Sequence, residues 1–321
     1  MKLTPDALSP EVKQQAIRDG FGSGLVKLGE RLPNVVALCA DLTDSTKMDG
    51  FAKAFPERFV EVGVAEQNLV TVATGMALAG KIPFVSSYAA FSPGRNWEQI
   101  RTTVCLNETN VKIAGSHAGV SVGPDGATHQ MLEDIALMRV LPNMTVVVPC
   151  DSVEAEKATI ALASHPGGAY IRLAREKSAV ITTPDTPFAL NKAQILREGE
   201  DITIVACGLL VHQALLAAEK LKQKGIEAEV INAAVVKPLD SVTILKSVKK
   251  TGRVVTCEES QIAGGLGSAV TELLSENFPV PVRRIGMRDR FGESGKPDEL
   301  LEHFGLTAPH IMKAAEELIK E

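Results

Sequence analysis

Short apolar segments alternate with helical segments along this chain, and this alternation limits its possible folds more than any other feature. The stretch from Glu66 to Leu78, for example, follows a strand-like run and has helical spacing. Continuous apolar runs are typical of strands buried on both faces, as in parallel sheets covered by helices on both sides. The first part of the chain has six such runs: Val35–Ala40, Phe59–Val62, Pro83–Val85, Val111–Ala114, Thr145–Val148 and Ala169–Ile171.

A second alternating series begins at Ile202 and continues to the end of the chain. Before it, Thr182–Pro187 carries two prolines and lacks helical periodicity, which indicates a linker. We therefore expect two α/β domains, each a mainly parallel sheet with helices on both faces. The first covers residues 1–180, the linker covers residues 181–200, and the second domain covers residues 201–321. We also expect a helix over residues 10–32, and in the second domain one strand over the apolar run Ala228–Val236.

Charge and cysteine content argue against several classes of protein. The 34 Lys and Arg residues against 39 Asp and Glu are spread along the chain, whereas a nucleic-acid surface needs a clustered basic excess. No apolar run approaches the roughly 18–20 residues of a membrane span, and the start lacks the apolar core of a secretory signal. An odd number of cysteines without a CxxC pair indicates reduced core residues in a cytoplasmic protein. These are Cys39, Cys105, Cys150, Cys207 and Cys257.

Polar and aromatic side chains follow the predicted strands of the first domain. Taken singly, each has an ordinary structural role: Glu66 as an acid at a helix start, His117 as a hydrogen-bonded histidine, Asp125-Gly126 as a turn. Ligands of open parallel sheets bind outside the carboxyl ends of the strands. The convergence of these side chains at that edge of the sheet therefore favours a binding site. The loops are Asp41–Ser45, Gly63–Asn68, Ser86–Phe91, Ser116–His117 and Gly123–His129.

Several common site motifs are missing. The chain has no Walker A sequence, no GxSxG, and no His/Cys cluster with zinc spacing, so we predict no metal site on this chain. The run Gly264–Gly267 follows a strand and leads a helix, but it lacks the G-x-G-x-x-G spacing of dinucleotide sites. We interpret it as a tight turn where backbone packs closely.

At these loops the sequence resembles the transketolase family of thiamine-diphosphate enzymes. The resemblance covers almost the whole chain, but only the C-terminal half of a full-length transketolase. It implies a pyrimidine-binding domain followed by a transketolase C-terminal domain. The matching motifs, in the family's order, are Ala40–Leu42, Val62–Asn68, Asp125–Gln130, Phe291–Gly295 and Glu302–Gly305.

The resemblance implies a cofactor role for five residues. In this family the aminopyrimidine of thiamine diphosphate, in its imino form, removes the C2 proton of the cofactor's own thiazolium ring. A protein carboxyl group that is hydrogen-bonded to N1′ favours this imino form. By the resemblance that carboxyl is Glu66, and Phe91 is the ring that stacks on the pyrimidine. Tyr88 helps to line the pocket, Leu42 supports the bent cofactor and Asp41 orders the loop.

Substrate roles follow from the same resemblance. His129 resembles the histidine that holds the oxygen near the ketose C1, and Asp125 resembles the acid that reads a sugar hydroxyl. The residues that line up with the family's sugar-phosphate-binding residues are Arg18, Ser45, His117 and Arg175. Two arginines, a hydroxyl and an imidazole suit a phosphate dianion. Arg172 competes with Arg175 for its role, and Arg95 offers another cation.

Two features depart from the family pattern. Gly94 stands where typical members have an aromatic residue three positions after the stacking Phe, which helps to hold the amino group. The chain also lacks the Gly-Asp-Gly segment and later Asn that grip the magnesium ion and the diphosphate. The resemblance therefore implies a second polypeptide, an N-terminal transketolase subunit that supplies the Mg2+ ligands, assembled with this chain as a heterotetramer.

The implied activity is transfer of a two-carbon ketol unit from a ketose phosphate to an aldose phosphate, by this chain only with its partner subunit. One alternative is the beta subunit of a 2-oxo acid dehydrogenase first component, which typically lacks the pattern from Asp125 to His129. Another is a deoxyxylulose-phosphate-synthase-like enzyme, which shares that pattern but is usually one long chain. A non-catalytic subunit is a third reading, although it has no chemical need for Glu66, Asp125 and His129 together.

Overall fold

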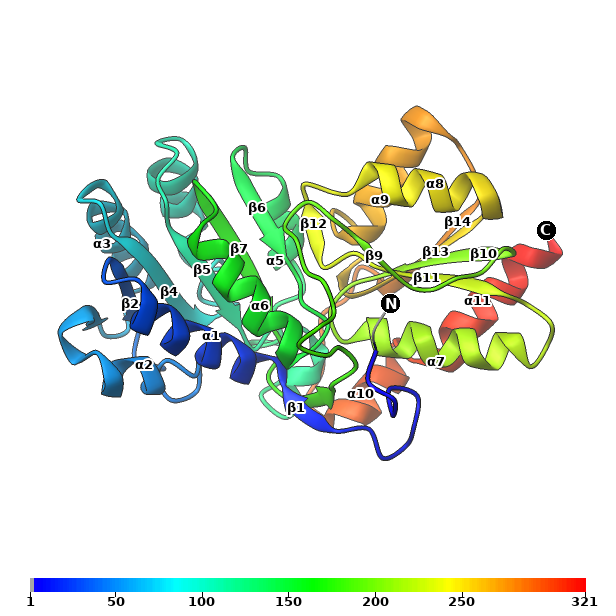
Figure 1. The fold of residues 1–321 in the computed structure, drawn as a ribbon, viewed down its shortest axis with the longest axis horizontal. Helices are drawn as coiled ribbons and strands as arrows, with labels where there is room; N and C mark the ends of the chain where they lie inside the picture. Colours follow the sequence, from blue (N-terminus) through cyan, green and yellow to red (C-terminus); the bar gives the residue numbers. More distant parts are fainter. Residues whose placement is uncertain (1–2) are drawn as a thin grey trace.

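The chain folds into two sheets that lie side by side, each covered by helices (Figure 1). The computed structural model describes residues 3–321. Within them, the larger sheet has seven strands in the order β12-β6-β7-β5-β4-β2-β3, parallel except for β12. These strands are β2 (Val35–Cys39), β3 (Phe59–Glu61), β4 (Ile82–Tyr88), β5 (Lys112–Ser116), β6 (Met144–Val147), β7 (Gly168–Leu173) and β12 (Val235–Lys237).

The second sheet has five strands in the order β14-β13-β10-β11-β9, and β9 is its antiparallel edge. A separate antiparallel pair joins the segment before the first helix to the segment after β7. The five strands are β9 (Gln194–Arg197), β10 (Ile202–Ala206), β11 (Ala228–Asn232), β13 (Val254–Gln261) and β14 (Val282–Met287), and the pair is β1 (Gln14–Ala16) with β8 (Lys177–Ala179).

Helices cover both faces of each sheet, which confirms the predicted α/β class with two domains. On one face of the larger sheet, α1 approaches α6 so closely that a Cβ on Gly20 would lie 1.8 Å from the carbonyl oxygen of Ser152. The helices are α1 (Ile17–Arg31), α2 (Asp49–Ala54), α3 (Glu66–Leu78), α4 (Trp97–Gln99) with a π-helix (Ile100–Cys105), α5 (Asp134–Arg139), α6 (Ser152–Ala163), α7 (Leu210–Lys222), α8 (Ser241–Thr251), α9 (Leu266–Asn277), α10 (Pro297–His303) and α11 (Ala308–Lys320), with 3-10 turns at Pro56–Arg58 and Val120–Val122.

The structure differs from the predicted elements in three places. The first helix begins at Ile17 rather than near residue 10, because residues 14–16 pair with β8. The segment Gln194–Arg197, inside the predicted linker, forms β9 at the edge of the second sheet. The apolar run Ala228–Val236 is not one strand: it divides into β11 in the second sheet and β12, which crosses to the first sheet.

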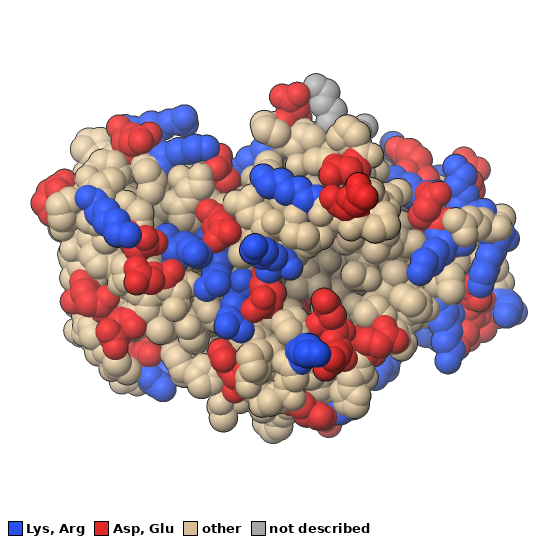
Figure 2. All heavy atoms as spheres, turned by 90° about the horizontal axis from the view of Figure 1, so that it is seen from below, with Lys and Arg blue, Asp and Glu red and all other residues tan. Residues whose placement is uncertain are grey.

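The five cysteines are all free and buried. Among residues 3–321, none of the helices combines the length and apolarity that a membrane crossing needs. Acidic and basic side chains are interspersed over the face seen from below, on the side of α10 (Figure 2).

Candidate active site

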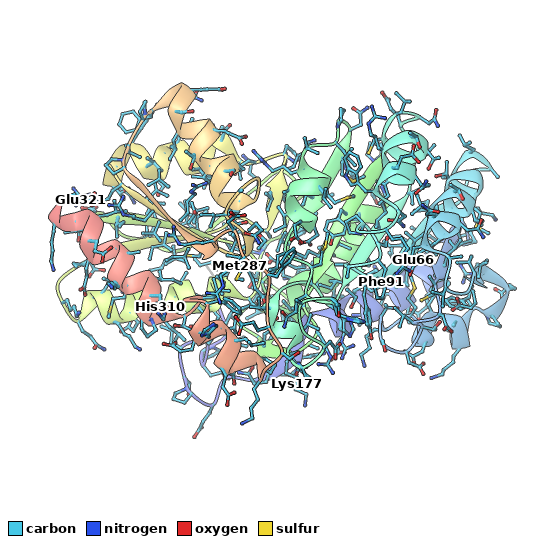
Figure 3. All side chains as sticks on the ribbon, turned by 180° about the vertical axis from the view of Figure 1, so that it is seen from behind. Glu66, Phe91, Lys177, Met287, His310 and Glu321 are labelled. Carbon is cyan, nitrogen blue, oxygen red and sulfur yellow. The ribbon has the colours of Figure 1, made fainter. Side chains whose placement is uncertain are left out.

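The loops after β2, β3, β4 and β5 gather at one edge of the first sheet, because these four strands run parallel and adjacent. Figure 3 shows Glu66 and Phe91 close to each other at this edge, although they come from different loops. The convergence that the sequence predicted for these two side chains is therefore present in the structure.

Glu66 is the first residue of α3, and only 2% of its surface is exposed. Its Oε2 accepts a hydrogen bond from Nη1 of Arg95 at 2.7 Å, and its carbonyl oxygen accepts one from Nδ2 of Asn96 at 2.8 Å. The start of a helix favours a negative charge. The carboxylate is thus fixed by the helix and by the loop after β4, while its cationic partner Arg95 is half-exposed.

Four rings form a cluster beside this carboxylate. Tyr88 stacks on His117 with 3.8 Å between ring centroids, and it lies 5.9 Å from Phe91. His129 meets Phe91 edge-on at 5.5 Å, while the guanidinium carbon of Arg95 lies 4.8 Å from the centre of the same Phe91 ring. Phe91 therefore has a flat cation near its ring and an imidazole at its side.

Positive charge accumulates next to the rings. Nη1 of Arg18 donates to the carbonyl oxygen of Ser45 at 2.6 Å and lies 3.3 Å from Nε2 of His117. Nε of Arg18 is buried without a hydrogen-bond partner among the described residues. Burial, opposed by Asp19 and reinforced by Arg175, lowers the pKa of Arg18. Ser45 enters this cluster through its carbonyl oxygen.

His117 is buried and adopts a left-handed conformation, with φ at 57°. Its Nδ1 lies 2.9 Å from the hydroxyl of Ser116. Burial, together with the charges of Arg18, Arg175 and His129, lowers the pKa of His117 to about 3. The imidazole is therefore neutral at pH 7, so its Nε2 can serve as donor or acceptor according to its tautomer.

The two competing arginines lie in different surroundings. Arg172 is buried: its Nε donates to Oδ2 of Asp134 at 2.9 Å, and its Nη2 donates to the carbonyl oxygen of Glu259 at 2.7 Å. Arg175 is partly exposed, donates to the carbonyl oxygen of Val122 at 2.8 Å and acts electrostatically on His117. Of the two, Arg175 is the arginine near the positive cluster.

Asp125 and His129 lie on the loop between β5 and α5. Asp125 is exposed at a turn closed by the bond from the Gly126 N–H to the carbonyl oxygen of Gly123. Nδ1 of His129 lies 2.9 Å from the hydroxyl of Thr128, and its ring faces the aromatic cluster. The structure therefore brings His129 to the rings, while Asp125 forms no hydrogen bond or ion pair with the other predicted site residues in the described part of the chain.

Family models match both domains: the transketolase pyrimidine binding domain over residues 13–179, and the transketolase C-terminal domain over residues 191–311. The chain belongs to the transketolase family.

Its relatives include C-terminal subunits. The chain is 44% identical over 308 residues to the 6-deoxy-6-sulfo-D-fructose transketolase subunit SqwH of Clostridium sp. (strain MSTE9), covering 96% of each chain. It is 45% identical over 310 residues to a putative transketolase C-terminal section of Methanocaldococcus jannaschii, covering 96% of this chain and 97% of the relative. Among solved structures, a split gene transketolase in an inactive beta4 tetramer has a TM-score of 0.90 at 47% identity, covering 95% of this chain and 98% of that one. The predicted resemblance to the C-terminal half of a split transketolase is confirmed.

The site fits the flat aminopyrimidine of thiamine diphosphate, the cofactor of the transketolase family. The guanidinium of Arg95 is a planar group with N–H donors, and it lies over Phe91 while it bonds to Glu66. By the family resemblance, the pyrimidine would make the same two contacts. Because the side chain of Arg95 is 51% exposed, it has room to turn outward when another ring takes this place.

Among residues 3–321, no group of three or more His, Cys, Asp or Glu side chains is placed to hold a metal ion.

Two residues that shape the site escaped sequence reasoning or received a minor role. Glu61, at the end of β3, accepts bonds from the backbone N–H groups of Asp41 and Gly63 at 2.7 and 2.9 Å, and from the Thr43 hydroxyl at 3.0 Å. It thereby holds the loop on which Asp41 is exposed. Its position at a strand end was the available signal. Arg95 was predicted only as an additional cation.

The loop that carries Arg95 also explains Gly94. A Cβ at this position would lie 2.1 Å from the carbonyl oxygen of Ala90, so the backbone here excludes any side chain. The aromatic residue of typical family members therefore has no equivalent at this point of the loop. Leu42, by contrast, is partly buried and packs against the core beneath the sheet edge.

Proposed function

We propose that this chain is the C-terminal subunit of a thiamine-diphosphate-dependent transketolase, which transfers a two-carbon ketol unit from a ketose phosphate to an aldose phosphate. One observation supports this above all: a planar nitrogen donor, the Arg95 guanidinium, lies over Phe91 and is bonded to the buried carboxylate of Glu66. Thiamine diphosphate, when bound, supplies the nucleophilic carbon and the electron sink for carbon–carbon cleavage.

In this proposal the chain's own residues hold rings, protons and hydroxyl groups. Glu66 holds the pyrimidine by a hydrogen bond at N1′, and Phe91 presents its ring face. Tyr88 helps to line the pocket, Leu42 supports the bent cofactor and Asp41 orders the loop. His129, edge-on to Phe91, is placed to donate to a substrate oxygen. Asp125, on the same loop, is the candidate for reading a sugar hydroxyl.

The anionic end of the sugar binds at Arg18, with His117, Arg175 and Ser45 beside it. Support comes from the buried Nε of Arg18, which has no hydrogen-bond partner among the described residues, and from the charges of Arg18 and Arg175, which both act on His117. A relative acts on a 6-deoxy-6-sulfo-D-fructose, whose sulfonate is a tetrahedral anion like phosphate. The proposed site therefore takes a sugar with a terminal tetrahedral anion, and phosphate is our first choice.

A partner polypeptide completes the enzyme. We propose an N-terminal transketolase subunit that holds the diphosphate and Mg2+, in a heterotetramer with two copies of each chain. Described residues of this chain offer no metal site, and the similar solved structure is a beta4 tetramer described as inactive.

The decisive assay is sedoheptulose 7-phosphate formation from xylulose 5-phosphate and ribose 5-phosphate, with thiamine diphosphate and Mg2+. We expect product from the complex with the partner subunit and none from the chain alone. If a cofactor-loaded complex forms no product with these sugars but does form product with a sulfonated ketose donor, the terminal anion of the substrate is sulfonate rather than phosphate. A complex inactive with both donors would overturn the proposed function.

The anion site has its own matched test. Arg18→Met removes a guanidinium bonded to a carbonyl oxygen in the site, whereas Arg58→Met removes one bonded to the carbonyl oxygens of Leu32 and Gly29 elsewhere. We expect Arg18→Met to raise the KM for the phosphorylated donor by about 10–100-fold, since a charge-assisted bond contributes roughly 1.5–3 kcal/mol. Arg58→Met should leave this KM unchanged. Equal KM values in the two variants would remove Arg18 from the anion site.

A further inference from the structure

The loop that carries Asp125 and His129 is held from the second domain. Gln130, which is 3% exposed, donates through Nε2 to the carbonyl oxygens of Val120 and Gly123 at 3.2 and 3.0 Å, and to that of Glu293 at 2.8 Å. The first two bonds close the loop upon itself. The third joins it to the segment between β14 and α10, 163 residues further along the chain.

A second attachment comes from Glu259 on β13. Its Oε1 accepts a bond from the Ser121 N–H at 2.6 Å, and its Oε2 lies 3.9 Å from Nη1 of Arg172. A Cβ on Gly119 would lie 2.3 Å from the carboxyl carbon of Glu259, so this glycine allows the close approach. The beginning of the loop is thus tied to a buried carboxylate of the second domain.

Close packing reinforces both attachments. A Cβ on Gly126 would lie 2.4 Å from the hydroxyl oxygen of Ser294, and one on Gly292 would lie 1.8 Å from Oε1 of Gln130. Gly126 has φ at +73°, which glycine adopts without steric cost. At both places a glycine backbone on one side therefore packs against a side-chain oxygen on the other, and one of these glycines, Gly126, directly follows Asp125.

We propose that the second domain positions the substrate loop, and that Gln130 and Glu259 are its positioning residues. Among the described residues, the imidazole of His129 has one hydrogen-bond partner, the hydroxyl of its neighbour Thr128, and the His129 N–H donates to the carbonyl oxygen of Gly126 within the same loop. The place of this ring beside Phe91 therefore depends on the loop backbone that Gln130 holds. The inference rests on the proposed function, in which His129 contacts the sugar. It assigns to the second domain a role in substrate binding that is separate from assembly.

The test compares two buried glutamines in the complex with the partner subunit. Gln130→Met keeps the side-chain length but removes all three bonds. Gln194→Met removes the hydrogen bond that a similarly buried glutamine donates to the carbonyl oxygen of Pro187. We expect Gln130→Met to lower kcat/KM by about 10–100-fold, since a misplaced contact group costs this much, with cofactor affinity unchanged. Gln194→Met should retain the wild-type value. Equal values for the two variants overturn the proposal.

A double-mutant cycle separates positioning from a general structural effect. If Gln130 acts by holding His129, Gln130→Met should lower kcat/KM much less in a His129→Ala background than in the wild type. The same loss in both backgrounds would show that Gln130 does not act through His129.

One readout does not depend on transketolase activity. Amide hydrogen exchange over residues 119–130 should be faster in Gln130→Met than in the wild type or in Gln194→Met. It should also be faster in Glu259→Leu than in Glu259→Gln, because the glutamine keeps an oxygen that accepts the Ser121 N–H. Faster exchange in Gln130→Met and Glu259→Leu, together with a wild-type complex that has no transketolase activity, would support the attachment of the loop to the second domain and refute the proposed function. Unchanged exchange would refute the attachment itself.

Discussion

Two buried carboxylates stand at helix N-termini in the two domains, and they are used differently. Glu258 in the second domain accepts the N–H groups of Leu266 and Gly267 at the start of α9, both at 2.8 Å, and the Ser260 hydroxyl at 2.6 Å. Glu66 in the first domain is bonded instead by a half-exposed arginine. One carboxylate is satisfied by fixed groups, whereas the other has a partner that can leave.

The comparison also explains the glycine run before α9. A Cβ on Gly265 would lie 1.9 Å from Oε2 of Glu258, so the glycine lets the chain's own carboxylate reach the helix start. The place that a phosphate would take is already filled. The interpretation of Gly264–Gly267 as a tight turn with close packing holds for Gly264 and Gly265, whereas Leu266 and Gly267 already belong to α9.

The largest effect is expected for Glu66→Gln. It removes the carboxyl group that the proposal places on the cofactor while it preserves size, so turnover by the complex should fall at least about 100-fold. The melting temperature should change little, because the lost ion pair involves a half-exposed arginine. Steady-state kinetics and thermal unfolding of the same samples check both parts. A Glu66→Gln complex with wild-type turnover would contradict the assigned role.

Glu258→Gln should show the reverse of Glu66→Gln, with lower stability and nearly unchanged turnover. Two helix N–H groups lose a charged acceptor, so the free energy of unfolding should fall by about 1–3 kcal/mol. Turnover per folded molecule should stay within a factor of two or so, since the groups that donate to the Glu258 carboxylate, in the part of the chain that the structure describes, all lie in its own domain. Denaturant unfolding and kinetics test this together. A large loss of turnover at unchanged stability would erase the contrast between the two carboxylates.

The site should also leave a pH signature through His117. Its folded pKa of about 3 lies below the unfolded value near 6.5. Between these values the unfolded chain binds more protons, so stability falls as pH falls through this window, by at most about tenfold in the unfolding constant per pH unit. His117→Asn, which tolerates the left-handed backbone, should weaken this slope. Parallel pH profiles of the two proteins would exclude His117 as its source.

The smallest effect is expected at a glycine inside α3, and it contrasts with a larger effect at the glycine before α9. Gly75 lies inside α3, and a Cβ on it would have nothing within 4 Å, so Gly75→Ala should stabilise the isolated chain by about 0.4–1 kcal/mol. Gly265→Ala should destabilise it by about 1–3 kcal/mol, because the methyl group meets Glu258. Denaturant midpoints measure both changes. Destabilisation of similar size in both variants would contradict this picture of α9.

Local patterns were enough to predict much of the fold. The bounds of α3 agree with the predicted helix, since a strand-like run, an acid and helical spacing mark them. The path of β12 was missed, because an apolar run indicates burial but not which sheet it joins. The start of α1 was placed too early because pairing of β1 with β8 depends on residues far along the chain.

For the candidate site too, local patterns predicted which loops meet but not the contacts between distant residues. Parallel strand order brought Glu66, Phe91 and His129 to one edge, as expected from the loops that follow the strands. The sequence did not indicate that Arg95 bonds to Glu66, nor that Gln130 bonds to the carbonyl oxygen of Glu293. Such contacts are set by side-chain rotamers and by distant backbone, and no local spacing records them.

The central claim is that Glu66 activates the cofactor, and exchange of the C2 proton of thiamine diphosphate for deuterium measures this directly. In the complex with the partner subunit, acid-quenched samples analysed by proton NMR should show exchange at least about 100-fold faster for the wild type than for Glu66→Gln, and equal rates for the wild type and Glu258→Gln. Equal exchange rates in the wild type and Glu66→Gln, with cofactor bound in both, would contradict the claim.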